Sequence, residues 1–256
     1  MPRLEIEQFT CLSDNYGVLI HDPEAGLTAS IDAPEEHGVL DALQRKGWTL
    51  THIFTTHHHM DHVGANLALK QRFDAEIIGP KDEEAKIPGI DRAVSDGESF
   101  QFGNFKVNVI STPGHTAGEI SYYIPQAQVA FTGDTLFALG CGRLFEGTPA
   151  TMHRSLQKLI ALPGETEIYC GHEYTQSNAR FALSVDPDNA ALKERARQIA
   201  ILRENGKPTL PTNIFLEMAT NPFLRADDPA IRGHLGMESA SDEQVFTELR
   251  KRKDHF

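Results

Sequence analysis

Five of the twelve histidines in this chain fall within eleven residues, and this cluster restricts its possible folds and functions more than any other feature. The segment Thr56–His62 reads Thr-His-His-His-Met-Asp-His and follows an apolar run, Leu50–Thr55, that predicts a strand. In extended backbone, residues two apart point the same way. His57 and His59 can therefore bind one metal ion, while His58 points away.

The last two ligand-type residues of the cluster, Asp61 and His62, follow where a turn would lead into a helix, and they can face a second ion. Imidazole and carboxylate groups together suit zinc, iron or manganese rather than calcium or magnesium. The alternative interpretation is a polar loop that happens to be rich in histidine.

Three more residues of ligand type recur in one local context, each just after an apolar strand and a glycine that allows a tight turn. They are His115 in Thr-Pro-Gly-His-Thr, Asp134 in Thr-Gly-Asp-Thr and His172 in Cys-Gly-His-Glu. Loops at strand ends carry the functional residues in many layered α/β proteins. Taken singly, each residue is more typical of a turn or a cap. Together with the histidine cluster, they predict one metal site assembled from four strand ends.

Short apolar runs rich in β-branched and aromatic residues fill the first two-thirds of the chain and predict strands. The candidate strands are Leu4–Thr10, Gly17–His21, Leu27–Ile31, Leu50–Thr55, Glu76–Ile78, Phe105–Ile110, Ile120–Ile124, Val129–Thr132 and Glu167–Tyr169. Helical patterns interleave with them at Pro34–Lys46, Gly64–Phe73 and Thr148–Ala161. This alternation predicts an α/β fold in which helices cover a sheet or sheets.

The pattern changes after about residue 173, beyond which no run predicts a strand. Asn189–Glu204 has apolar residues at helical spacing and stops at an Asn-Gly pair typical of a helix end. Ile214–Ala219 is a shorter helical run, and the last segment begins at Ser241 with Gln244 three residues on, as in a capping box. We therefore expect two units, residues 1–173 and a helical appendage over residues 174–256.

Charge and cysteine content argue against several classes of protein. A net charge of −12 over 256 residues disfavours a general binder of nucleic acid or of anionic membranes. No run approaches the roughly 18–20 apolar residues needed to cross a bilayer. The first residues also lack the apolar core of a signal peptide. Three cysteines without a CxxC pair favour a reducing compartment over a disulfide scaffold.

The pattern His57-x-His59-x-Asp61-His62, followed by His115, Asp134 and His172, resembles the ligand set of the metallo-β-lactamase superfamily. Within it, the chain is similar to the hydroxyacylglutathione hydrolase family, also called glyoxalase II. The segments Asn-Pro-Phe-Leu-Arg at 221–225 and Arg250-x-x-Lys253-Asp254 match that family too. The resemblance implies an αββα sandwich with a C-terminal helical domain. Residues 1–173 would be the catalytic domain, and residues 174–256 a helical domain that binds glutathione.

The resemblance also implies how the ligands are shared between two divalent metal ions per chain. His57, His59 and His115 would hold the first ion, whereas Asp61, His62 and His172 would hold the second, and Asp134 would bridge both. Zinc is the default, and iron and manganese accept the same ligands. Two such ions can share a hydroxide, which Asp61 and Asp134 would hold in position for attack.

Substrate contacts are implied at five positions, namely Arg143, Phe145, Tyr174, Arg250 and Lys253. Eukaryotic members tend to have lysine and tyrosine where this chain has Arg143 and Phe145, and a phenylalanine cannot supply a hydroxyl hydrogen bond. In the last helix, Arg250 and Lys253 are spaced to share the face that also carries apolar residues. The alternatives are ordinary core packing for the aromatic residues and a solvated helix end for the two cations.

The function implied is hydrolysis of S-(2-hydroxyacyl)glutathione, typically S-D-lactoylglutathione, to glutathione and D-lactate. This reaction is the second step of methylglyoxal detoxification in the cytoplasm. The partner would be a small molecule, with neither nucleic acid nor membrane involved, and we expect a monomer.

Two alternative functions stay open. One is another superfamily enzyme, such as a lactonase, a β-lactamase or an iron-dependent glutathione persulfide dioxygenase. The other is a non-enzymatic metal-binding or nucleic-acid-binding protein that kept the fold.

Overall fold

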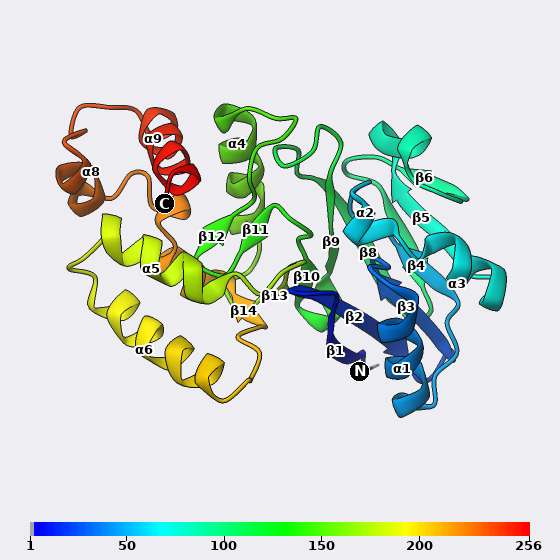
Figure 1. The fold of residues 1–256 in the computed structure, drawn as a ribbon. Helices are drawn as coiled ribbons and strands as arrows, with labels where there is room; N and C mark the ends of the chain where they lie inside the picture. Colours follow the sequence, from blue (N-terminus) through cyan, green and yellow to red (C-terminus); the bar gives the residue numbers. More distant parts are fainter. Residues whose placement is uncertain (1–2) are drawn as a thin grey trace.

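The computed structural model describes residues 3–256 and contains two six-stranded sheets packed face to face (Figure 1). The first sheet has β1 (Glu5–Cys11), β2 (Asn15–Asp22), β3 (Leu27–Ile31), β4 (His52–Phe54), β5 (Glu76–Pro80) and β6 (Arg92–Val94) in chain order. The second has β14 (Thr212–Asn213), β13 (Glu167–Tyr169), β10 (Val129–Phe131), β9 (Ile120–Ile124), β8 (Phe105–Ser111) and β7 (Ser99–Phe102) side by side in that order. A separate hairpin is formed by β11 (Leu136–Phe137) and β12 (Gly140–Cys141).

Helices cover the outer face of each sheet, which makes the four-layered αββα sandwich implied by the family resemblance (Figure 1). The first sheet is covered by α1 (Glu36–Lys46), α2 (Met60–Val63) and α3 (Asn66–Phe73). The second is covered by α4 (Pro149–Ile160) and α9 (Asp242–Asp254). The remaining helices, α5 (Thr175–Val185), α6 (Ala190–Glu204), α7 (Ile214–Thr220) and α8 (Pro229–Leu235), complete a helical C-terminal part. Short 3₁₀ turns occur at Lys81–Lys86, Pro125–Ala127 and Pro222–Leu224.

An apolar core between the two sheets explains why these runs form strands. Alternate residues point inward, such as Phe100 and Phe102 of β7, because successive side chains of a strand face opposite ways. The ring of Phe54 in β4 lies 5.1 Å from the ring of Phe100, centroid to centroid, so aromatic side chains from both sheets interlock.

Strand direction brings the functional loops to one edge of the sandwich. β10 and β13 are parallel, and β8 and β10 are both antiparallel to β9, so β8, β10 and β13 run in the same direction. The segments that follow these three strands therefore leave the second sheet at one edge. The segment after β4 joins them there, since the Ile120 N–H donates to the Thr56 carbonyl across the two sheets at 3.0 Å.

The structure corrects the sequence-based expectations in several places. The prediction that no strand follows residue 173 is wrong, because β14 pairs with β13. It is two residues long, too short to show a periodic pattern. Asp61 and His62 lie in the helical turn α2 rather than in an irregular turn. The sequence also gave no prediction for α5, α8 and strands β6, β7, β11 and β12. Across residues 3–256, none of the helices combines the length and the apolar character needed to cross a membrane.

Candidate metal centre

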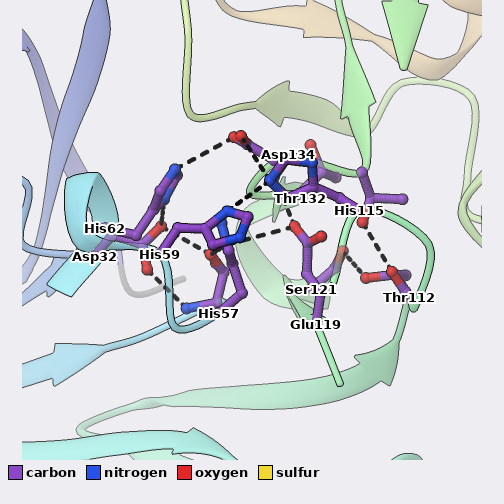
Figure 2. A network of polar contacts seen from close by, with 12 residues as sticks. Asp32, His57, His59, His62, Thr112, His115, Glu119, Ser121, Thr132 and Asp134 are labelled. Atoms are coloured by element: carbon purple, nitrogen blue, oxygen red, sulfur yellow. Dashed lines mark hydrogen bonds and ion pairs between the residues drawn. The ribbon is translucent and has the colours of Figure 1, made fainter. Parts of the chain in front are cut away.

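The seven ligand-type side chains singled out in the sequence come together at this edge. They reach it from separate elements: His57 and His59 after β4, Asp61 and His62 in α2, His115 after β8, Asp134 after β10 and His172 after β13. Figure 2 shows His57, His59, His62, His115 and Asp134 gathered around one centre.

The first group of ligand-type atoms belongs to three histidines. One ring nitrogen from each of His57, His59 and His115 lies within 4.8 Å of the others. Nε2 of His115 and Nδ1 of His59 are 2.9 Å apart. His58 is directed elsewhere, since its Nδ1 lies 2.8 Å from the buried carboxylate of Glu83.

The second group combines one carboxylate with two histidines. Oδ2 of Asp61 lies 3.3 Å from Nε2 of His172 and 3.7 Å from Nε2 of His62. Asp134 lies between the two groups. Its Oδ2 is 3.4 Å from Nε2 of His115 and 3.3 Å from Nε2 of His172. The arrangement therefore has two three-residue groups and a carboxylate shared between them.

Unsatisfied buried atoms indicate that this centre fits metal ions. Nε2 of His57, Nε2 of His62 and Oδ1 of Asp134 are buried and have no hydrogen-bond partner within the described part of the chain. Buried polar atoms rarely remain unpaired, because their desolvation is then uncompensated. All three point into a cluster of imidazole and carboxylate donors, the set that zinc, iron and manganese prefer. The residues therefore fit divalent cations.

The glycines that precede the ligands act in two different ways. Gly114 and Gly133 have φ angles of 155° and 46°, which other residues adopt rarely. Gly171 is needed for close approach instead. A Cβ atom added there would lie 2.5 Å from Oδ1 of Asp134 and 2.7 Å from Cε1 of His62. The predicted tight turn therefore occurs at Gly114 and Gly133, whereas Gly171 leaves room for the cluster.

Burial and neighbouring charges shift the pKa values of the cluster residues in different directions. Burial lowers the pKa of His57 well below its usual range, and His62 adds to this effect, so this ring is neutral, the form that binds a metal. Burial alone would raise the pKa of Asp134, but His62 and His172 outweigh it and hold that pKa well below its usual range. In the same way, burial would lower the pKa of His172, but Asp134 raises it to about 10.

Supporting hydrogen bonds orient the histidines, and sequence reasoning missed most of the partners. Four ring Nδ1 atoms are held from behind: His57 by Thr56 Oγ1 (3.0 Å), His62 by Asp32 (2.8 Å), His115 by the Arg143 carbonyl (2.8 Å) and His172 by Asp14 (2.9 Å). Such contacts select the tautomer that presents the other nitrogen to a metal.

Two buried carboxylates, Asp32 and Glu119, also support the ligands, and only Asp32 stands in a sequence context that could have identified it. Asp32 also accepts from the Thr56 N–H at 2.7 Å, and it directly follows a predicted strand, as the ligands do. Glu119 accepts from the Asp134 N–H at 2.6 Å. It stands before a strand rather than after one, so no sequence signal marked it.

A cavity of about 920 Å³ opens beside the cluster of ligand-type side chains. Its lining includes all five residues implied as substrate contacts: Arg143, Phe145, Tyr174, Arg250 and Lys253. Tyr174 stacks on the ring of His172 with a centroid separation of 4.7 Å and an interplanar angle of 4°. Phe145 is 62% exposed, with its ring edge-on to that of His115, so it lies on the rim rather than in the core.

The two cations of α9 have different surroundings. Arg250 is buried and donates to the Cys141 carbonyl at 3.0 Å and to Asp254 Oδ1 at 2.8 Å. Lys253 is half-buried, and its Nζ makes longer contacts of 3.3 and 3.4 Å to Ser177. Burial, with a contribution from Arg250, lowers the pKa of Lys253 to about 8. Arg250 thus anchors the helix to the body, while the charge of Lys253 faces the cavity with weaker protein partners.

Comparison with known proteins assigns both parts of the chain to families. Residues 24–172 match the family model of the metallo-β-lactamase superfamily, and residues 173–256 match the model described as the hydroxyacylglutathione hydrolase C-terminus. Proteins from Brucella ovis and Brucella abortus named hydroxyacylglutathione hydrolase are each 69% identical to this chain over 254 residues, covering 99% of both sequences.

Solved structures share the same architecture. The B3 metallo-β-lactamase BLEG-1 is 22% identical, with a TM-score of 0.65, and the match covers 86% of this chain and 99% of that one. ETHE1 from Myxococcus xanthus is 31% identical, with a TM-score of 0.61, and the match covers 87% of this chain and 99% of that one. Since the two family models together span residues 24–256 and full-length relatives are 69% identical, the chain belongs to the hydroxyacylglutathione hydrolase family of the metallo-β-lactamase superfamily.

Proposed function

We propose that this chain hydrolyses S-(2-hydroxyacyl)glutathione thioesters, typically S-D-lactoylglutathione, and releases glutathione and D-lactate. One observation carries the proposal: a single cavity of about 920 Å³ is lined both by Lys253 and by five of the seven ligand-type residues, namely His59, Asp61, His115, Asp134 and His172. A glutathione thioester has its reactive carbonyl several bonds away from its carboxylates. A site that has its hydrolytic groups at one place and the Lys253 ammonium at another therefore suits such a thioester. The relatives named hydroxyacylglutathione hydrolase support the same activity.

The ligand assignment is part of the proposal. His57, His59 and His115 would hold one divalent cation, Asp61, His62 and His172 a second, and Asp134 both. Zinc is the default, with iron or manganese as alternatives. Bound cations of this kind supply Lewis acidity, which makes water a nucleophile near neutral pH and stabilises negative charge on a carbonyl oxygen.

The protein's own side chains would orient the reactants. Asp61 is half-buried and lines the cavity, so its carboxylate can accept a hydrogen bond from the attacking water and hold it in line. Asp134 also lines the cavity, and its carboxylate would help to hold the same water. The departing glutathione is a stable thiolate, and the reaction needs no general acid at that step. Lys253 would bind a glutathione carboxylate, with Arg143, Phe145 and Tyr174 lining the path between.

The biological setting is proposed on the same basis. We infer the second step of methylglyoxal detoxification in the cytoplasm, carried out by a monomer on a small-molecule substrate. The three cysteines are buried and unpaired with one another, which suits a reducing compartment.

A panel of two thioesters and a β-lactam tests the proposal. We expect S-D-lactoylglutathione to be hydrolysed far faster than lactoyl-coenzyme A or a β-lactam, with metal content measured on the same sample. Equal rates for the first two thioesters would remove the specificity for glutathione. Preferential turnover of the β-lactam would favour the β-lactamase alternative.

A further inference from the structure

The β11–β12 hairpin enters the helical C-terminal part by its tip. Its turn includes Leu139, whose φ angle of 58° lies in the left-handed region that disfavours residues other than glycine. The Leu139 side chain is fully buried in a cluster with Ala179, Ala182, Leu192 and Ile199 of α5 and α6. A strained turn of this kind persists only where its surroundings hold it.

A buried polar network holds the backbone of this hairpin. Glu217 of α7 accepts from the Leu139 N–H at 2.8 Å. The side-chain amide of Asn221 donates to the Phe137 carbonyl at 3.2 Å, to the Gly140 carbonyl at 3.0 Å and to Glu217 at 3.0 Å. Asn221 and Glu217 are completely buried, so these hydrogen bonds form away from water, and removing the Asn221 amide takes its buried hydrogen bonds away from both carbonyls.

The charge of Glu217 is also compensated inside the network. Arg195 of α6 pairs with Glu217 and donates to Thr212 at 2.9 Å. Buried charges are tolerated when they are paired and hydrogen-bonded in this way. The network therefore connects α6, α7 and the hairpin through polar atoms whose positions are well defined.

The other side of the hairpin forms part of the catalytic cavity. The ring of Phe137 is edge-on to that of Tyr174 at 5.4 Å and to that of His172 at 6.1 Å, and it lines the cavity. The hairpin also connects Asp134 to Arg143 along the chain. A shift of its backbone would therefore move residues at both ends of the proposed site.

We propose that Asn221 and Glu217 are positioning residues for the hydrolysis: by holding the β11–β12 hairpin, they fix Phe137 against His172 and Tyr174. The C-terminal part then acts on the hydrolytic centre itself, in addition to its contact with substrate through Lys253. This inference rests on the proposed function.

The test compares two asparagines of the same helical segment. Asn221→Ala removes the donors to the hairpin. Asn213→Ala removes the cap at the other end of α7, where the Asn213 side chain accepts from the Leu216 N–H, and leaves the hairpin contacts intact. Both variants would be assayed at equal metal content per chain. Hydrogen exchange of the peptide covering residues 136–142, kcat, KM and Tm would be measured for each.

We expect Asn221→Ala to speed exchange in residues 136–142 and to lower kcat by about 10- to 100-fold, the effect of misplacing reacting groups by a fraction of a bond length to one ångström. KM should change less than kcat, because Lys253 lies on α9, outside the network. Asn213→Ala should lower Tm while leaving kcat and hairpin exchange as in the parent.

Two results would overturn the inference: an Asn221→Ala variant with parental kcat, or equal losses of kcat in both variants. If Asn221→Ala does not fold, Asn221→Asp replaces it, since the aspartate keeps the shape of the side chain and the acceptor for the Phe223 N–H but lacks the amide donors to the hairpin. An unchanged kcat there would also overturn the inference. Hydrogen exchange requires no substrate, so it tests whether Asn221 and Glu217 hold the hairpin independently of the proposed function. A parent protein that fails to hydrolyse glutathione thioesters would refute the proposed function alone.

Discussion

Asp134 is the residue whose carboxylate lies between the two groups of ligand-type side chains. Its Oδ2 lies within 3.4 Å of ring nitrogens from both groups, and the side chain is buried. Asp134→Ala should remove the shared negative charge and lower kcat/KM for the thioester by roughly 10³-fold or more. Steady-state kinetics with metal analysis of the same preparation would measure this loss.

His58 provides the matched control for Asp134. It belongs to the same histidine cluster, but its Nδ1 pairs with Glu83 at 2.8 Å and its ring is in neither group of ligand-type atoms around Asp134. His58→Ala should therefore leave kcat/KM close to that of the parent. Comparable losses in the two variants would mean that the ligand set is misassigned.

The proposed contact between Lys253 and the substrate predicts that substrate binding depends on pH. Its pKa of about 8 lies below the ordinary value of 10.5 because of burial, so the ammonium loses its proton as the pH rises through 8. We expect kcat/KM to fall above about pH 8, after subtraction of base-catalysed thioester hydrolysis, while kcat changes little. Lys253→Arg keeps its charge and should move this decline to higher pH. A decline that is identical in Lys253→Arg would assign the titration to another group.

The same shift affects stability with a definite sign. The folded protein loses the Lys253 proton near pH 8, whereas the unfolded chain keeps it up to about the ordinary value of 10.5. Between these values the unfolded state binds more protons, so this group makes the free energy of unfolding rise with pH across that window.

At the scale of single elements, α9 is a helix with two differently used faces. Ser241 and Gln244 form a capping box at its start, as predicted, and Phe246, Leu249 and Arg250 are buried against the body. Lys253 follows on the same face at the cavity, while Lys251 is exposed on another side. The helix therefore presents one cation to the proposed substrate and others to solvent.

Substitutions on the two faces of α9 should separate these roles. Lys253→Ala would remove the proposed substrate contact, which we expect to be equally strong in the ground and transition states, so KM should rise by between a few-fold and about a hundred-fold with little change in kcat. Lys251→Ala is the control and should keep the parental KM. Added salt should weaken substrate binding more in the parent than in Lys253→Ala. A higher KM for Lys251→Ala alone would show that the helix binds substrate through its other face.

At the scale of the whole molecule, the candidate metal ligands come from both sheets. His57 and His59 follow a strand of the first sheet, while His115, Asp134 and His172 follow strands of the second. Ions held between them would favour the folded state, because the unfolded chain does not assemble the site.

Removal of metal should therefore reduce both activity and stability. We expect elemental analysis to give two ions per chain and a strong chelator to abolish turnover. Free metal at a thousand times its Kd stabilises the fold by about 4 kcal/mol for each bound ion, which for a protein of this size corresponds to a Tm increase of roughly 8–16 °C per ion. Calorimetry before and after chelation would measure the shift. Full activity with one ion per chain would eliminate the binuclear centre.

Most of the candidate metal ligands could be predicted from short segments of the sequence. The types of donor, their positions after apolar strands and the phase of α9 depend on residues close together in the chain. Alternation and helical spacing therefore predicted the α/β layers and brought His115, Asp134 and His172 into one expected cluster. The resemblance to a known family then supplied the division of the ligands and the substrate class, which spacing alone leaves open.

The tertiary structure decided what depends on contacts between distant segments. Glu217 and Leu139 are 78 residues apart, yet their hydrogen bond holds the hairpin. Arg250 and Lys253 share one helix face, but only packing of that face against Cys141 determined that Arg250 is buried as an anchor while Lys253 faces the cavity. Burial and hydrogen-bond geometry follow from how whole elements dock, and no local pattern of residue types encodes that docking.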